Sequence, residues 1–168
     1  MTAKTNLLES KKVRAIFIVL FIAYILLLLK LIIFRYPIPM MVSAFQTALS
    51  QPLSEKIMSV NLVPLKTISF YLAGKPSLGV ARINLIGNII AFVPFGFILP
   101  IIFKRLRSFI LVFILALLFI LLLETIQLLT TVGAFDVDDI TLNILGTVLG
   151  YIVFKVFTKM GKNKEKAA

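Results

Sequence analysis

The sequence predicts an all-α integral membrane bundle of about four transmembrane helices, with an external interfacial segment between the first and the second. The chain has 168 residues, 60% of them hydrophobic. Its apolar runs approach the roughly 20 residues that a helix needs to cross a hydrocarbon core. The runs are continuous and do not alternate with polar residues, which favours helices over strands. We therefore expect one membrane domain over residues 15–157, between a basic N-terminal segment (1–14) and a basic tail (158–168).

The first span is expected at about residues 15–34. It contains Lys30, whose long side chain can reach the interface from near the helix end. A cleaved signal peptide is the alternative, because basic residues precede the apolar run and residues 42–44 faintly resemble a cleavage site. The run is longer than the about 7 to 15 apolar residues of a signal peptide, which favours a retained helix.

The other three spans are expected at about residues 83–103, 108–129 and 140–157. A short basic turn, residues 104–107, joins the second span to the third. Twelve of the 18 Lys and Arg residues fall in the N-terminal segment, this turn and the chain from Lys155 onward. The positive-inside rule then predicts a cytoplasmic N-terminus and a cytoplasmic C-terminus.

A long segment from Arg35 to Arg82 separates the first two spans. It is apolar in its first part, and Pro52 and Pro64 end whatever helices form in it. We expect helices that lie along the external membrane surface. A poorly ordered loop is the alternative.

The residue types that are missing limit the chemistry. The chain has no cysteine and no histidine, which excludes disulfides, Cys or His metal sites and catalysis by a histidine base. Its net charge of +11 belongs to a chain with few soluble segments, so we interpret it as attraction to anionic membrane lipids and not to nucleic acid.

Glu124 is the most informative residue. It follows an uncharged apolar stretch of the third span, where a carboxylate costs about 2.5 to 3.5 kcal/mol to insert. Its position about 24 Å along a helix that rises from the cytoplasmic side places it in the outer part of the bilayer. Gln127 follows one turn further out. A buried carboxylate needs a partner or a task, and Glu124 is the candidate catalytic residue.

Polar residues of the other spans are expected at the same depth as Glu124. Asn84 and Asn88 share one face of the second span, and an acidic stretch precedes the fourth. The candidate ligand-binding residues are Asn84, Asn88, Glu124, Gln127, Asp136, Asp138, Asp139 and Asn143. Helix capping is the alternative for the three aspartates. Polar contacts that only hold helices together are the alternative for the whole set.

Small residues four apart are expected to pack helices closely. Gly146 with Gly150 in the fourth span and Gly87 with Ala91 in the second both form such pairs. The absence of a large side chain at these positions lets helix backbones approach each other.

The order and spacing of these motifs resemble the VanZ-like family of bacterial membrane proteins over about residues 60–152. The motifs are Asn61 to Ile68, Asn84 to Asn88, Phe92 to Phe97 with Pro100, Glu124 with Gln127, and Phe135 to Asp139 with Asn143 and Gly146. The resemblance implies a multi-pass protein of the bacterial cell membrane. The family is named for a member associated with low-level teicoplanin resistance.

One stretch departs from the family pattern. Relatives often carry an arginine in the loop before the acidic segment, where this chain has Thr131, Val132, Gly133 and Ala134. Any pairing with the acids must then pass to Arg82 or to a bound ion.

Two functions of different class follow from these observations. The first is a non-enzymatic protein whose outward-facing polar site binds a lipid-linked cell-wall precursor or another envelope ligand, lowering susceptibility to teicoplanin-type lipoglycopeptides. The second is a membrane-embedded enzyme that acts on lipid-linked phosphate or sugar, with Glu124 as general acid or base. In the second, Asp136, Asp138 and Asp139 would hold Mg²⁺ or Ca²⁺. A transporter is less favoured because four spans show no inverted repeat, unless the chain forms an oligomer.

Overall fold

The computed structural model describes residues 10–33 and 37–167 of the chain. Most of the basic N-terminal segment predicted over residues 1–14 therefore lies outside the described residues. The helices, in chain order, are α1 (Lys11–Ile33), α2 (Ile38–Ser50), α3 (Leu53–Met58), α4 (Lys66–Leu72), α5 (Leu78–Ile102), the 3-10 turn η2 (Lys104–Arg107), α6 (Phe109–Thr130) and α7 (Val137–Ala167).

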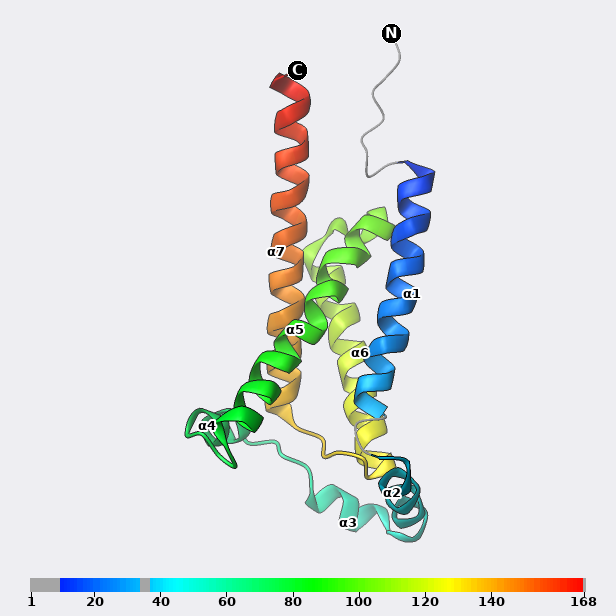
Figure 1. Cartoon of the computed structure of the whole chain (residues 1–168), viewed down its shortest axis with the longest axis vertical. Helices are drawn as coiled ribbons and strands as arrows, with labels where there is room; N and C mark the ends of the chain where they lie inside the picture. Colours follow the sequence, from blue (N-terminus) through cyan, green and yellow to red (C-terminus); the bar gives the residue numbers. More distant parts are fainter. Residues whose placement is uncertain (1–9, 34–36, 168) are drawn as a thin grey trace.

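Four of these helices, α1, α5, α6 and α7, are long and apolar enough to cross a membrane. The candidate spans are Lys11–Ile32, Leu78–Ile102, Phe109–Thr130 and Val137–Met160. In Figure 1 the start of α1 and the end of α7 lie at the same end of the bundle. The predicted all-α membrane bundle is confirmed.

α5 and α7 extend furthest beyond the bounds that the sequence predicted. α5 begins at Leu78, where the hydroxyl of Ser77 accepts a hydrogen bond from the Val80 N–H and caps the helix. α7 begins at Val137 and continues to Ala167, so the predicted basic tail is mostly a continuation of the last membrane helix. Polar ends of a helix carry no apolar signal, which is why hydropathy underestimates both lengths.

α5 and α7 pack backbone to backbone at glycines. A Cβ on Gly146 would stand 2.0 Å from the carbonyl oxygen of Ile89, and one on Gly150 would stand 2.0 Å from that of Val93. On α5, a Cβ on Gly96 would stand 1.9 Å from the carbonyl oxygen of Thr147. Any side chain at these positions would force the two helices apart.

The prediction that Gly87 packs closely against another helix is wrong. No described atom lies within 4 Å of the point where a Cβ on Gly87 would stand. This glycine lies on an exposed face of α5, whereas Ala91 is half-buried. The carbonyl oxygen of Ala91 accepts a 2.7 Å hydrogen bond from the Tyr24 hydroxyl, which ties α1 to α5.

An aromatic core joins α1, α5 and α6. Phe92 and Phe95 of α5 are buried against Ile120 of α6, and Leu28 of α1 closes the same core. The Phe95 ring stacks on that of Phe119 with centroids 5.4 Å apart. Burial of each such side chain contributes about 1.5 to 3 kcal/mol in water, and in lipid the gain comes from close packing.

The three short helices α2, α3 and α4 lie at the end of the bundle opposite the start of α1 (Figure 1). The Lys56 ammonium donates to the carbonyl oxygens of Ala48 at 2.7 Å and Leu129 at 3.0 Å. These carbonyls belong to the last turns of α2 and α6, where a cation also complements the helix dipole. Lys56 thereby fastens the linking segment to the bundle.

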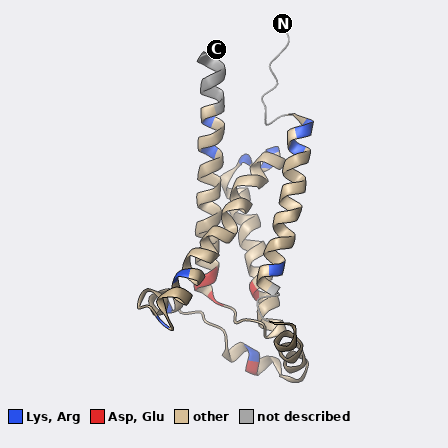
Figure 2. Ribbon diagram, viewed as in Figure 1, with Lys and Arg blue, Asp and Glu red and all other residues tan. Residues whose placement is uncertain are grey.

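The described Asp and Glu residues lie at one end of the bundle, whereas Lys and Arg residues occur at both ends. In Figure 2 the described acids gather at the end that carries α2, α3 and α4, and most of the cations gather at the other end. The acidic end therefore holds the polar residues that the sequence singled out.

Candidate functional site

A backbone pairing brings the segment before α4 against the start of α7. The Asn61 N–H donates to the Phe135 carbonyl at 2.8 Å, and the Val137 N–H donates to the Asn61 carbonyl at 3.0 Å. This pairing joins residues about seventy positions apart. It places the acidic stretch beside the N-terminus of α4.

Asp138 caps α4 from across the fold. Its Oδ1 accepts the Leu65 N–H at 2.6 Å, and its Oδ2 accepts the N–H groups of Thr67 at 2.7 Å and Ile68 at 3.1 Å. Leu65 has a left-handed φ of 64°, a backbone conformation that a branched residue adopts only when its surroundings hold it. Asp138 is 1% exposed, so these three donors replace its hydration.

The Asp136 carboxylate also accepts hydrogen bonds from several donors of the chain. It accepts the Asn61 amide at 3.0 Å, the Thr67 hydroxyl at 2.5 Å and the Asp138 N–H at 2.8 Å. The last of these bonds lies in the first turn of α7, which Asp136 caps. We call Asn61, Thr67, Asp136 and Asp138 the capping cluster. The contacts of its two aspartates are those of helix caps, which the sequence analysis gave as the alternative to ligand binding.

A second group lies deeper, between α5, α6 and α7. It consists of Asn88, Glu124, Asp139 and Asn143, which we call the bundle cluster. The Asn88 amide donates to Asp139 Oδ1 at 2.6 Å. Asn143 follows Asp139 by one turn on the same face of α7.

Glu124 is 3% exposed and is the carboxylate that links the two clusters. Its Oε2 accepts the Asp136 N–H at 3.1 Å, and the charges of Asp139 and Asp136 act on it repulsively. Within the described residues no Lys or Arg forms an ion pair with Glu124, and Arg82, the cation that the sequence offered, is exposed. The bundle cluster thus concentrates acceptors and negative charge without a neighbouring cation on Glu124.

Asn143 carries the clearest sign of an incomplete site. The residue is 7% exposed, and its side-chain Oδ1 is buried with no hydrogen-bond partner among the described residues. A buried acceptor without a donor costs about 1 to 3 kcal/mol, and such groups are rare in folded proteins. Asn143 Oδ1 is therefore free to accept one further hydrogen bond.

Two of the predicted site residues, Asn84 and Gln127, have described contacts outside the two clusters. The Asn84 amide donates to the Val80 carbonyl at 2.9 Å on its own helix. Gln127 lies beside Gly133, whose N–H donates to the Gln127 carbonyl at 3.3 Å. No hydrogen bond joins the Gln127 side chain to the bundle cluster in the described part of the chain.

The three aspartates do not form a shared cation site. Among residues 10–33 and 37–167, no group of three Asp or Glu side chains is arranged to hold a metal ion. Both oxygens of Asp138 face backbone N–H groups, whose positive ends would repel a cation. The candidate Mg²⁺ or Ca²⁺ set of Asp136, Asp138 and Asp139 is thus not supported by the geometry.

The family comparison agrees with the motifs in these clusters. A model of the VanZ/LLP1 family matches residues 21–158, well over half of the chain. The chain belongs to the VanZ/LLP1 family. Neither the curated proteins nor the solved structures gave a significant match. Membership of the VanZ/LLP1 family and the four apolar helices together make this a multi-pass membrane protein of the VanZ-like type.

The VanZ/LLP1 match also includes residues whose role sequence reasoning missed. Asn61 and Thr67 lie in a motif that was noticed only as part of the resemblance, yet both donate to Asp136. Asn and Thr near a short helix start signal a turn or a cap, because their side chains bond readily to nearby backbone groups, but that local signal does not reveal the distant Asp136 as their partner.

Proposed function

We propose that this VanZ-like protein binds the polar head of a lipid-linked cell-wall precursor or another envelope ligand in the bundle cluster. Binding would restrict access of teicoplanin-type lipoglycopeptides to that ligand and so lower susceptibility to them. The observation that carries the proposal is the buried Oδ1 of Asn143, which has no hydrogen-bond partner among the described residues, in a cluster that also contains the buried carboxylate of Glu124.

The chemistry of the bundle cluster favours a donor-rich ligand. Glu124, Asp139 and Asn143 present acceptor oxygens, and the Asn88 amide and the Asp136 N–H donate into this group. Sugar hydroxyls, peptide amides and ammonium groups all supply the missing hydrogen bonds. A phosphate would be repelled by the acids, so we place it outside the cluster, nearer the exposed Arg82.

The position of the cluster suits an amphipathic ligand. Glu124 lies in α6 and Asn88 in α5, both within candidate membrane spans and near the acidic end of the bundle. A ligand held there can keep its lipid chain in the bilayer while its head reaches the cluster. A binding role fits this geometry better than metal-assisted catalysis, which requires the converging ligand set that the acids do not make.

The decisive experiment compares Glu124→Gln with Thr125→Val in cells exposed to teicoplanin. Glu124→Gln keeps the size of the side chain and removes its charge, whereas Thr125 is exposed and its hydroxyl donates to the Leu121 carbonyl of its own helix. We expect Glu124→Gln to abolish protection while the amount of protein in the membrane stays unchanged. In native mass spectrometry, the same variant should lose the ligand that co-purifies with the wild type. Thr125→Val should behave as wild type.

Full protection by Glu124→Gln would contradict the proposal and leave the cluster as structural polar contacts between helices. Release of a cleaved product from a lipid-linked substrate, lost in the same variant, would instead assign an enzymatic role to Glu124.

A further inference from the structure

An apolar groove lies on the bundle away from both polar clusters. Its volume is about 350 Å³, and α1, α5 and α7 all contribute to it. The lining residues include Phe17, Leu20, Val93, Pro94, Phe97 and Val153. Phe17 is near the start of α1 and Val153 is in the later half of α7, so the groove lies in the half of the bundle nearer the basic end.

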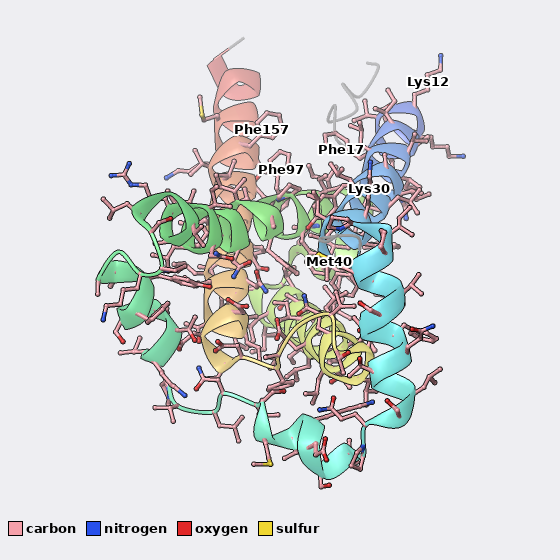
Figure 3. The ribbon with its side chains drawn as sticks, turned by 60° about the horizontal axis from the view of Figure 1, so that its bottom comes forward. Lys12, Phe17, Lys30, Met40, Phe97 and Phe157 are labelled. Carbon is pink, nitrogen blue, oxygen red and sulfur yellow. The ribbon has the colours of Figure 1, made fainter. Side chains whose placement is uncertain are left out.

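A row of aromatic rings supports one side of the groove. The Phe97 ring packs edge-on against Phe17 at 6.4 Å and against Phe157 at 6.1 Å. Figure 3 shows these three residues in sequence from α1 to α7. Edge-to-face packing fixes the rings, so the groove has a firm wall that does not need an occupant to form.

The groove is open to the surroundings of the helices. Leu20 and Val153 on its rim are both 51% exposed. Because these residues lie in candidate membrane spans, the exposed surface faces hydrocarbon and not water. An occupant must therefore be apolar over the depth of the groove.

The charge next to the groove selects the head group of that occupant. Arg14 precedes Phe17 by three residues on the same side of α1, and Lys104 and Arg105 of η2 are exposed at the same end. Figure 2 shows Lys and Arg but no described acid at this end of the bundle. A basic rim above an apolar groove is complementary to an anionic head carried on an acyl chain.

We propose that this groove binds one acyl chain of an anionic phospholipid from the leaflet at the basic end, with its phosphate directed toward Arg14 and η2. This site is independent of the ligand proposed for the bundle cluster. It lies in the opposite half of the bundle and uses none of the same residues.

Occupancy is tested by native mass spectrometry of the full chain in detergent, titrated with phosphatidylglycerol or with phosphatidylcholine. We expect one tightly retained phosphatidylglycerol. Val153→Phe should fill the groove and weaken that binding about tenfold. Ile152→Phe is the matched control, because Ile152 is 50% exposed on the adjacent helix position and does not line the groove.

The head-group contact is tested by Arg14→Gln against Lys12→Gln. Both changes remove one charge from the first turn of α1, but Figure 3 shows Lys12 on the side of the helix away from Phe17. We expect Arg14→Gln to weaken phosphatidylglycerol binding about fivefold and to leave phosphatidylcholine binding unchanged. Lys12→Gln should change neither.

Leu20→Phe fills the groove from α1 and provides a second test in case Val153→Phe does not fold. Melting curves of both variants without added lipid report their stability. Equal lipid retention by wild type and both filled variants would overturn the proposal. So would equal affinity for the two phospholipids. A dimer that both filled variants dissociate, with no lipid retained by wild type, would assign the groove to a second copy of the chain.

Discussion

The capping cluster and the bundle cluster both bury carboxylates near the start of α7, but they satisfy them to different degrees. Asp138 accepts three backbone N–H groups from the start of α4, and Asp136 accepts three further donors. In the bundle cluster, Glu124 accepts one described hydrogen bond and the Oδ1 of Asn143 accepts none. Donors from the described chain thus surround both aspartates of the first cluster, whereas the second cluster keeps one buried acceptor without a donor.

The difference separates two uses of acidic residues that look alike in the sequence. Where backbone N–H groups surround a carboxylate, its charge stabilises a helix start and holds two segments together. Where a buried acceptor lacks a donor, as at Asn143 Oδ1, the fold bears an energetic cost that a bound hydrogen-bond donor would offset. Stability should therefore depend on the first cluster and ligand binding on the second.

The largest effect is expected from Asp138→Ala. This change leaves the N–H groups of Leu65, Thr67 and Ile68 without their acceptor, so the free energy of unfolding should fall by about 3 to 5 kcal/mol. Thermal unfolding in detergent measures the loss. Asp139→Asn, which keeps an oxygen for the Asn88 amide, should cost only about 1 kcal/mol. Similar losses in the two variants would remove the distinction between the clusters.

A smaller loss is expected when the floor of the bundle cluster is forced open. Gly146→Ala places a Cβ against the Ile89 carbonyl, which should cost about 1 to 3 kcal/mol and separate Asn88 from Asp139. Gly87→Ala meets open space, so it should be neutral or stabilise α5 by about 0.5 to 1 kcal/mol. Melting temperatures of the pair provide the comparison. Equal destabilisation by both changes would show that α5 and α7 do not pack as described.

Asn143→Ala sharpens the comparison at the level of function. Removing a buried oxygen that has no partner should leave the free energy of unfolding within about 1 kcal/mol of wild type. Retention of the envelope ligand in native mass spectrometry should nevertheless be lost. A strongly destabilised variant that still binds the ligand would show that Asn143, like Asp138, stabilises the fold and does not bind the ligand.

The last pair of substitutions, to cysteine, reports which end of the bundle is outside. Ser77→Cys lies at the acidic end before α5, and Ser108→Cys lies at the basic end before α6. An impermeant maleimide added to whole cells should label the first and not the second. The reverse pattern would place both polar clusters on the cytoplasmic side.

Hydropathy alone determined the number of membrane helices, and the motif order alone determined the family. Apolar runs of this length leave the backbone one way to satisfy its hydrogen bonds in lipid, so neither result needed a neighbour in space. The importance of Glu124 was equally visible, because a carboxylate inside such a run is costly wherever the helix points.

Only the tertiary structure decided what each polar or small residue does. Asp138 became a cap because pairing between Asn61 and the start of α7 brought the N–H groups of α4 to it, and backbone donors leave no trace in the sequence. Gly87 and Gly146 have similar local patterns, yet only Gly146 faces another backbone. The rotation of a helix about its own axis is set by the side chains of all its neighbours at once, which is information that a local sequence pattern does not contain.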